Sequence, residues 1–286
     1  TLGAIVGVVL AVHVLIPVLG LRLAVTLAAL ADIALGVLLL RAYSDQPKST
    51  RILAAIGIGF GAVVLSLTMG KLDPRALVSG VFRHGRAAID ESSEIHFLRD
   101  GKTATVSFMS RGSVGSISTN GKPDASIELR RDGFPTPDEI TMAMAAALPL
   151  SLHPAPRDIA VIGWGSGLTT HTLLGSPVPE KVDSIEIEVA MYDGARNFGS
   201  RVVRAYSDPR SKLHVDDART YFSTGQRKYD VIVSEPSNPW VSGVAGLFTR
   251  EFYRFMRRHL NDGGMVVQWV QSYELDDALL YTMVSA

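Results

Sequence analysis

Short β-rich segments alternate with helical segments through the second half of the chain, and this alternation most constrains the fold. The β-rich segments are DIAVIGWG, KVDSIEIE, SKLHV, YDVIVS and GGMVVQWV, and helical segments such as LFTREFYRFMRRHL lie between them. Strands joined through helices pair in parallel, because each helix carries the chain back across the sheet. The pattern predicts an α/β fold with a doubly wound parallel sheet, which binds ligands at the carboxyl ends of its strands.

A smaller β unit is expected upstream, between about Phe97 and Leu129. KTATVSFMS alternates with the period of two that is typical of a strand, GSVGSIST is a second candidate strand, and NGK at Asn120–Lys122 signals a tight turn. The segment DEITMAMAAALPLSL follows, with an acidic first turn and a proline near its end, and it predicts a helix. The upstream unit is therefore expected to be small and antiparallel.

Three glycines, Gly163, Gly165 and Gly167, directly follow the first strand of the parallel sheet. Missing side chains allow a tight turn there and let the backbone approach a ligand closely. Glu186 ends the second strand, about 20 residues further on, where an acid accepts hydrogen bonds from both hydroxyls of a ribose. Asp217 follows the third strand and is placed to accept a hydrogen bond from an adenine amino group. Together they predict an adenosine site, although the glycines alone would also fit a purely structural turn.

The spacing of these glycines narrows the choice of ligand. NAD is bound by a G-x-G-x-x-G turn whose following helix receives the pyrophosphate, whereas this chain has G-x-G-x-G. That spacing better suits a nucleoside without phosphate, so we expect S-adenosylmethionine or its decarboxylated form as the co-substrate. Ser166 and Asp216 neighbour these residues and are also candidate cofactor-binding residues.

The end of the fourth strand, YDVIVSEPSNPW, carries the candidate catalytic residues Glu235 and Asn238 and the candidate substrate contact Trp240. A sulfonium transfers an alkyl group by in-line attack, so the protein has to position the nucleophile and remove its proton. An amine nucleophile in water ordinarily has a pKa of about 10, and Glu235 would bind this cation and accept its proton. Trp164 or Trp240 would add cation–π attraction. The simpler alternatives are a surface turn acid for Glu235 and a packing role for Trp240.

The N-terminal part of the chain is predicted to cross a membrane. Only three side chains in Leu2–Leu40 could carry charge, Asp32 among them, and a second apolar run is Ile52–Met69. About 20 apolar residues cross the hydrocarbon core, so these runs fit three transmembrane helices, the first two separated near Gly20–Arg22. A buried helical hairpin is the alternative. Asp32 would serve helix packing or else a function inside the membrane.

Composition and charge limit the partners. The chain is 47% hydrophobic with a mean hydropathy of +0.21, which favours contact with membrane lipid. Its 28 basic and 28 acidic residues leave a formal net charge of zero, which argues against nucleic acid. It has no cysteine, and its histidines lack paired ligand spacing, so we expect no metal.

The flanking charges and the chain ends lead to two further expectations. A slight excess of basic residues on the side that includes Lys71, Arg75, Arg83 and Arg86 places the downstream domain in the cytoplasm of a multi-pass cell-membrane protein. The chain begins with Thr1 and stops within an apolar pattern, so we expect a fragment of a longer protein.

Residues 97–273 resemble the spermidine synthases, and more closely the membrane-fused spermidine synthase-like proteins. The resemblance is carried, in order, by GKTATVS, NGKPDAS, IGWGSG, IEIE, SDPR, YDVIVSEPSNPW, LFTREFY and GGMVVQW. It implies a small N-terminal β domain and a methyltransferase-like Rossmann domain, preceded here by transmembrane α-helices. It also implies transfer of an aminopropyl group from decarboxylated S-adenosylmethionine to an amine such as putrescine, in polyamine biosynthesis, with release of methylthioadenosine.

The resemblance also assigns residues and domains. Glu186 matches the ribose-binding acid and Asp217 the adenine-contacting acid, while Asp124 and Tyr273 are further candidate substrate contacts. We expect transmembrane helices over residues 1–70, the β-rich domain over 71–135 and the catalytic domain over 136–286, in a chain that forms a homo-oligomer.

Three departures from the family pattern weaken the match to a diamine. The family generally has G-G-x-D-G where this chain has GWGSG, so Ser166 replaces a carboxylate that grips the aminopropyl amine. The catalytic D-x-x-D pair is Glu235 and Asn238, and the Tyr-His/Gln-Glu cluster that helps hold the diamine is replaced at residues 141–143 by Thr, Met and Ala. A dication should bind poorly in a site that lacks those charges.

Three other functions remain open. SNPW loosely resembles the N-P-P-[YW] loop of amino-group methylases, which would make the chain a methyltransferase, although the second proline is missing. Cleavage of S-adenosylmethionine without an acceptor is a related option. A transporter-like membrane protein whose soluble domain senses a nucleoside or polyamine without turnover is an alternative of a different class.

Overall fold

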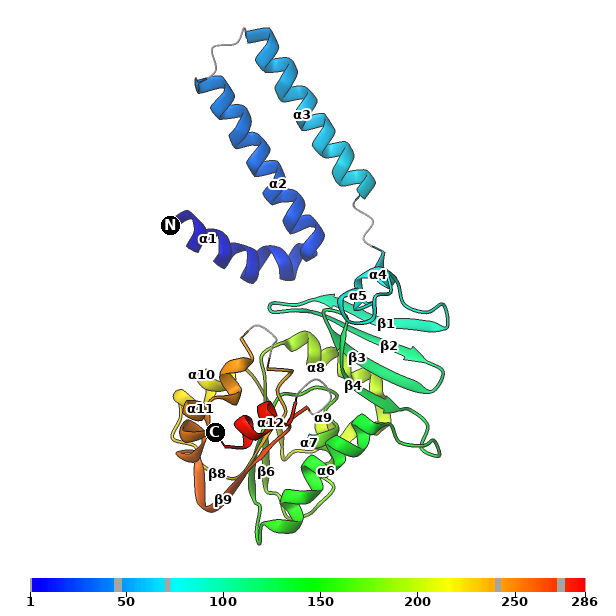
Figure 1. The fold of residues 1–286 in the computed structure, drawn as a ribbon, viewed down its shortest axis with the longest axis vertical. Helices are drawn as coiled ribbons and strands as arrows, with labels where there is room; N and C mark the ends of the chain where they lie inside the picture. The colour runs from blue at the N-terminus through cyan, green and yellow to red at the C-terminus, as the bar shows by residue number, and fades with distance from the viewer. Residues whose placement is uncertain (1, 44–47, 70–72, 240–242, 272–275, 286) are drawn as a thin grey trace. The chain divides into compact units, whose positions relative to one another are not determined.

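The computed structural model describes residues 2–43, 48–69, 73–239, 243–271 and 276–285 (Figure 1). The chain divides into two compact units, Thr1–Ile89 with Arg99–Thr105, and Asp90–Leu98 with Val106–Ala286. The apolar helices belong to the first unit. All described residues of the candidate site belong to the second.

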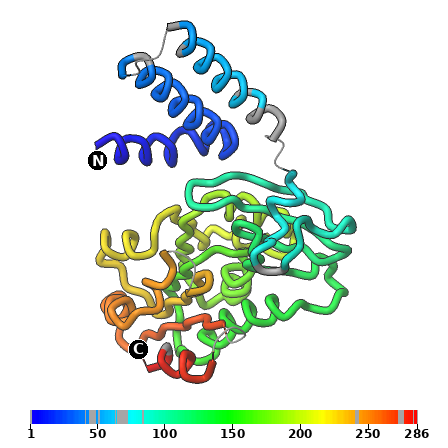
Figure 2. The backbone as a smooth tube through the Cα atoms, turned by 45° about the horizontal axis from the view of Figure 1, so that its top comes forward, coloured from blue at the N-terminus to red at the C-terminus, as the bar shows by residue number. Residues whose placement is uncertain are grey.

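The first unit begins with a long helical segment that is interrupted at Gly20. It comprises α1 (Leu2–Leu10), the π-helix η1 (Ala11–Leu15) and α2 (Ile16–Tyr43), and it is followed by α3 (Lys48–Met69), α4 (Pro74–Leu77) and α5 (Val81–His84). Gly20 has φ 77° and ψ 163°, which lie outside the helical region, so the break falls where the sequence predicted a boundary between two spans. In both views α2 and α3 lie side by side (Figure 2).

One stretch of the described helices is long and apolar enough to cross a membrane. It is Leu2–Leu40, with a hydropathy of 2.6 and no buried residue in its most apolar window, whereas Ile52–Ala62 is only a shorter apolar helix. Core helices of soluble proteins and signal sequences can have the same length and composition. The described residues therefore hold one candidate membrane span, which covers the first two predicted spans, and they do not support a multi-pass arrangement.

A four-stranded sheet follows the helices. Its strands lie in chain order as β1 (Ser93–Asp100), β2 (Thr105–Arg111), β3 (Val114–Thr119) and β4 (Lys122–Glu128). The β2–β3 and β3–β4 pairs are antiparallel. Asn120 and Gly121 have φ values of 50° and 78° and form the two-residue turn between β3 and β4. The predicted antiparallel unit is confirmed, and it begins earlier than expected, at Ser93.

The predicted parallel sheet is also confirmed. Its strands are β5 (Asp158–Ile162), β6 (Lys181–Glu186), β7 (Ser211–Val215), β8 (Tyr229–Ser234) and β9 (Leu260–Gln268), in the spatial order β7-β6-β5-β8-β9. All four neighbouring pairs are parallel. The chain runs outward from β5 to β7 and then returns to the other side of β5 with β8, so the switch point of the topology lies between β5 and β8.

Helices cover both faces of this sheet (Figure 1). The helices in this part of the chain are α6 (Pro137–Leu152), α7 (Leu168–Leu173), α8 (Val189–Ala195), the 3-10 helix η2 (Arg196–Arg201), α9 (Val203–Ser207), α10 (Ala218–Ser223), the 3-10 helix η3 (Ala245–Phe248), α11 (Arg250–Arg257) and α12 (Asp277–Val284). Along β5, Ile159 and Val161 pack with α6 and α7, whereas Ala160 and Ile162 pack with α10 and α11. This alternation follows from the period of two along a strand, and the apolar character of both sets explains why β5 is buried on both faces.

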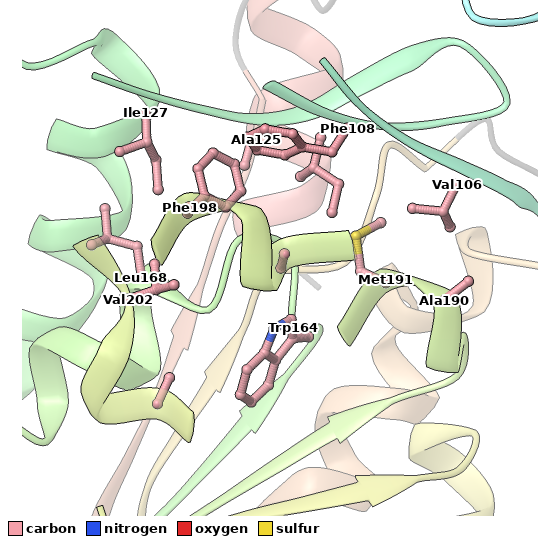
Figure 3. Close-up of a cluster of buried hydrophobic side chains, with 13 residues drawn as sticks. Val106, Phe108, Ala125, Ile127, Trp164, Leu168, Ala190, Met191, Phe198 and Val202 are labelled. Carbon is pink, nitrogen blue, oxygen red and sulfur yellow. The ribbon is translucent and has the colours of Figure 1, made fainter. Parts of the chain in front are cut away.

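A third buried cluster joins the small sheet to the parallel sheet. Phe108 of β2 and Phe198 of η2 meet edge to face, with their ring centroids 4.8 Å apart. In Figure 3 the cluster surrounds the helical layer of α8 and η2, and Trp164 belongs to it. The small sheet is thus packed on α8 and η2, and the loop that follows β5 contributes Trp164 to the same cluster.

A buried ion pair adds to this connection. The Glu139 side chain completes a capping box with Thr136 at the start of α6 and is paired with Arg201 of η2. Its Oε2 atom also accepts a hydrogen bond from the backbone N–H of Glu128 at the end of β4, at 2.8 Å. One carboxylate therefore holds β4, α6 and η2 together.

The aromatic pair gives a prediction for stability. Replacing Phe108 with alanine should lower the free energy of unfolding by about 3–5 kcal/mol, because the ring is fully buried and its removal leaves a cavity. Phe134→Ala is the control, since that ring is 89% exposed and its loss should change the free energy of unfolding by less than about 0.5 kcal/mol. Chemical denaturation of both variants measures the difference, and equal losses would contradict the packing described above.

Candidate active site

The candidate site lies at the carboxyl ends of β5, β6 and β8, where the topology changes direction. The backbone N–H of Gly163, after β5, donates to the carbonyl of Ile185 in β6 at 2.9 Å. The N–H of Glu235, after β8, donates to the carbonyl of Ile162 in β5 at 2.9 Å. These bonds continue the sheet beyond its regular strands and bring three loops to one place.

Gly163 leaves no room for a side chain. Its φ is 93°, and a Cβ atom at this position would lie 2.5 Å from the carbonyl oxygen of Glu235. Gly165 also has a positive φ, 51°, but a Cβ atom there would meet nothing within 4 Å. The first glycine is therefore required by contact with the loop after β8, whereas the second is required only by its backbone conformation.

Glu186, at the end of β6, is buried and directed at the glycine loop. Its Oε2 atom accepts a hydrogen bond from the N–H of Trp164 at 2.8 Å, and its Oε1 atom accepts one from the N–H of Glu188 at 2.9 Å. Burial raises the pKa of Glu186 to about 7, against the lowering effect of these two bonds. Each carboxylate oxygen keeps further acceptor capacity, as a ribose diol would require.

Trp164 is held in place by two tyrosines. Its Nε1 atom donates to the hydroxyl of Tyr206 at 3.2 Å, and its ring meets those of Tyr192 and Tyr206 with centroids 4.8 and 5.2 Å apart. The side chain is buried in the cluster with the small sheet. It therefore has a packing role, and the cation–π role considered for it would require a different side-chain position.

The Ser166 hydroxyl is already engaged within the protein. It donates to the Met142 sulfur Sδ in α6 at 3.0 Å and accepts from the N–H of Leu168 at 3.2 Å. Ser166 is fully buried. Two residues that depart from the family pattern, Ser166 and Met142, thus contact each other.

Asp216 and Asp217 follow β7, as predicted, but much of their bonding capacity is used locally. The N–H of Asp216 donates to the carbonyl of Glu186 at 3.0 Å, and Asp216 Oδ1 accepts from the N–H of Asp217 at 2.8 Å. Asp217 caps α10 by accepting from the N–H of Thr220 at 3.0 Å. Asp217 is exposed, and its second carboxylate oxygen is the atom that an adenine amino group would meet.

The loop after β8 holds Glu235 and Asn238. Desolvation by burial raises the pKa of Glu235 to about 7, and a hydrogen bond with the Thr169 side chain opposes this shift. Asn238 is 0% exposed, and neither its Oδ1 nor its Nδ2 atom has a hydrogen-bond partner among the described residues. A buried amide without partners is costly, so this group is suited to receive a polar group of a ligand.

A lysine that was not predicted completes the site. The Lys122 ammonium, at the start of β4, lies 3.1 Å from Asp124 Oδ1 and 3.1 Å from the Ser237 hydroxyl in the loop after β8. Both side chains of the ion pair are mostly buried, 11% and 13% exposed. The spacing of two in KPD places Lys122 and Asp124 on one face of β4, and this spacing was the available sequence signal.

Two predicted substrate contacts, Trp240 and Tyr273, lie outside the described residues. Thr141 and Met142, which replace members of the diamine-holding cluster, lie on α6. The Thr141 side chain is exposed, and its hydroxyl donates to the carbonyl of Pro137 at 3.0 Å. No group of three or more metal-ligating side chains occurs in the described part of the chain.

A parallel sheet with a glycine turn after β5 and an acid at the end of β6 is the arrangement of an α/β protein of the Rossmann type. The model of the family described as the spermine/spermidine synthase domain matches residues 139–285, slightly more than half of the chain. The chain belongs to this family.

Known relatives agree with this membership. A polyamine aminopropyltransferase from Nitrosomonas europaea is 36% identical over 126 residues, which cover 44% of this chain and 38% of the relative. A putrescine N-methyltransferase from Nicotiana tabacum is 31% identical over 141 residues, which cover 49% of this chain and 38% of the relative. The chain therefore spans less than half of the length of these curated relatives.

Two solved structures share the fold. A spermidine synthase in complex with the transition state analogue AdoDATO has a TM-score of 0.57 at 21% identity and covers 67% of this chain and 64% of its own. The spermidine synthase from Thermotoga maritima has a TM-score of 0.56 at 20% identity, with 67% and 63% covered. This likeness confirms the arrangement of a parallel sheet with an N-terminal β-sheet.

The close approach at Gly163 gives a second prediction. Gly163→Ala should lower the free energy of unfolding by about 1–3 kcal/mol more than Gly165→Ala, because both residues have positive φ but only Gly163 lacks space for a Cβ atom. The same substitution should weaken binding of methylthioadenosine, which isothermal titration calorimetry would measure. Equal effects of the two alanines would show that the contact with Glu235 does not constrain the loop.

Proposed function

We propose that this chain is an alkyltransferase that moves an aminopropyl group from decarboxylated S-adenosylmethionine to an amine acceptor and releases methylthioadenosine. The single observation that carries the proposal is the close approach of two loops at the switch point, where Gly163 contacts the backbone of Glu235 and bonds to Ile185, the residue before Glu186. One acid is suited to the nucleoside and the other to the reacting amine. Membership of the family and the aminopropyltransferase relatives support this reading.

In the nucleoside half, the loop of residues 163–167 would approach the donor with its backbone. Glu186 would accept hydrogen bonds from the ribose hydroxyls, and Asp217 would accept one from the adenine amino group. Gly165 has open space beside its Cα atom, so a ligand can come close to the backbone there. Ser166 and Asp216 would hold the loop ends through their internal bonds.

In the reacting half, the acceptor nitrogen attacks the propyl carbon next to the sulfonium. The N–C bond forms as the C–S bond breaks, the sulfur leaves as the neutral thioether of methylthioadenosine, and the ammonium proton passes to Glu235. A base with a pKa of about 7 suits this transfer near neutral pH. Asn238 would orient the acceptor through its unpartnered amide, with Trp240 and Tyr273 as further proposed contacts.

Methyl transfer is the second candidate. One relative is named as a putrescine N-methyltransferase, which supports this candidate. In addition, Ser166 replaces the carboxylate that would hold an aminopropyl amine. The products separate the two reactions, since methyl transfer from S-adenosylmethionine gives S-adenosylhomocysteine. Methylthioadenosine without an alkylated amine would indicate cleavage of the donor, and binding without any product would indicate a sensor.

The N-terminal helices are proposed to anchor the protein in a membrane. Leu2–Leu40 has the length and apolar character of a membrane-crossing segment, and its leucines and valines are largely exposed. α3 would pack against it as a further span, with the catalytic part in the cytoplasm. We also propose that the chain forms a homo-oligomer.

The reaction itself is tested by product analysis. Detergent-purified protein should convert decarboxylated S-adenosylmethionine and an amine into methylthioadenosine and the aminopropylated amine, identified by mass spectrometry. Glu235→Gln should reduce kcat by about 100- to 10,000-fold, because the amide cannot accept the proton. Binding of methylthioadenosine should be unchanged in that variant, and unchanged turnover would reject the role of Glu235.

The raised pKa of Glu235 predicts the pH dependence. Glu235 acts as a base only when ionised, so kcat/KM should rise about tenfold per pH unit below pH 7 from this group and bend near its pKa. Deprotonation of the acceptor amine should cause a second rise in kcat/KM, which continues toward the amine's own pKa of about 10. In Glu235→Gln the bend near pH 7 should disappear while the second rise stays. A bend that survives the substitution belongs to another group.

A further inference from the structure

The Lys122–Asp124 pair lies beside the loop after β8, and the charge of Asp124 also acts on Glu186. Lys122 Nζ lies 3.1 Å from the Ser237 hydroxyl, and Ser237 is the residue immediately before Asn238 and two positions after Glu235. The Ser237 hydroxyl also donates to Asp124 Oδ1 at 3.4 Å. The turn between β3 and β4 therefore places a buried ammonium beside the loop that carries both proposed catalytic residues.

Lys122 already occupies the carboxylate that a second ammonium of a substrate would need. Asp124 Oδ1 contacts the lysine, while Asp124 Oδ2 is buried and has no hydrogen-bond partner among the described residues. Asn238 and Ser166 are neutral. The proposed reaction uses Glu235 for the attacking nitrogen, so Asp124 is the nearby fixed carboxylate that remains for the far end of a diamine.

Building on the proposed function, we infer that Lys122 is a specificity-determining residue. Its ammonium stands in for the second ammonium of a diamine at Asp124, so the site accepts an amine whose far end is uncharged and excludes a dication. Asp124 Oδ2 and the Asn238 amide would instead bond to a neutral polar group on that far end.

Two physical effects exclude the second cation. An ammonium that reached Asp124 would come within a few ångströms of Lys122, and like charges repel strongly where water is largely excluded. The ammonium would also lose its hydration without gaining an unshared carboxylate. An amine with an apolar or hydroxyl-bearing far end incurs neither cost.

Titration calorimetry of the full chain in detergent, with methylthioadenosine present, tests the inference without relying on turnover. Putrescine is compared with 1-butylamine, which has the same carbon chain but one ammonium, and with 4-aminobutyrate, whose far end is anionic. Lys122→Gln is the test variant, because glutamine keeps hydrogen-bonding capacity toward Asp124 and Ser237 but lacks the charge. Lys212→Gln, at an exposed position on β7, is the matched control.

We expect the wild-type protein to bind putrescine no more tightly than 1-butylamine. Lys122→Gln should tighten putrescine binding by about tenfold or more and leave 1-butylamine within about threefold, whereas Lys212→Gln should change neither. Methylthioadenosine affinity and melting temperature confirm that each variant is folded.

Several results would overturn the inference. Tighter wild-type binding of putrescine than of 1-butylamine would do so, as would a putrescine affinity that Lys122→Gln leaves unchanged. If 4-aminobutyrate bound most tightly, Lys122 would be an anion-binding group instead. If none of the amines bound, the chain would have no amine site here. Failure of the proposed reaction is distinct, since it appears as the absence of any alkylated amine in the product analysis.

Discussion

The contact between Gly163 and the backbone of Glu235 is the constraint on which the site depends. A Cβ atom at position 163 would lie 2.5 Å from the carbonyl oxygen of Glu235, so the loops after β5 and β8 are as close as two backbones can be. The N–H of the same glycine bonds to Ile185 in β6, next to the buried Glu186. Because β5 is central and its neighbours are β6 and β8, one residue without a side chain joins the backbones of the two strand ends that carry Glu186 and Glu235. The buried cluster that joins the small sheet to α8 and η2 also includes Trp164 of this loop.

The replacements that remove charge from the site are physically connected. The Ser166 hydroxyl donates to Met142 Sδ, so a hydroxyl and a thioether meet where the family pattern has a carboxylate and a histidine or glutamine. Neither group needs a counter-ion, and both can be buried without an ionisation cost. Asn238 continues the same trend, because an amide replaces a carboxylate while keeping a donor and an acceptor. In the proposed function these exchanges would leave the nucleoside half unchanged and alter the amine half, and Lys122 would add a positive charge beside the loop after β8.

The sequence allowed much of the fold and half of the site to be predicted. Strand periodicity and the order of helices indicated both sheets, because these patterns are local, and the glycine turn with Glu186 follows from its position after named strands. Lys122 was missed because its importance depends on Ser237, which lies more than a hundred residues away in the chain. The bond between Ser166 and Met142 was missed for the same reason, since it depends on how α6 packs over the glycine loop. Periodicity shows which residues of a strand lie on the same face, but the contacts of that face with distant segments are set by tertiary packing.

In the proposed function, the electrostatics of the site would favour a ligand of limited positive charge. Glu186 and Glu235 both have pKa values raised to about 7 by burial, and the nearby charge of Asp124 raises that of Glu186 further. Between their ordinary value of 4.5 and pH 7 the folded chain therefore holds more protons than the unfolded chain, and the stability from these two groups is lost as the pH rises through 7. A cation bound beside the acids reverses this effect, because it favours their ionised forms and releases protons. One sulfonium and one ammonium would suffice to neutralise both acids, and a second ammonium would then have to compete with Lys122 for Asp124.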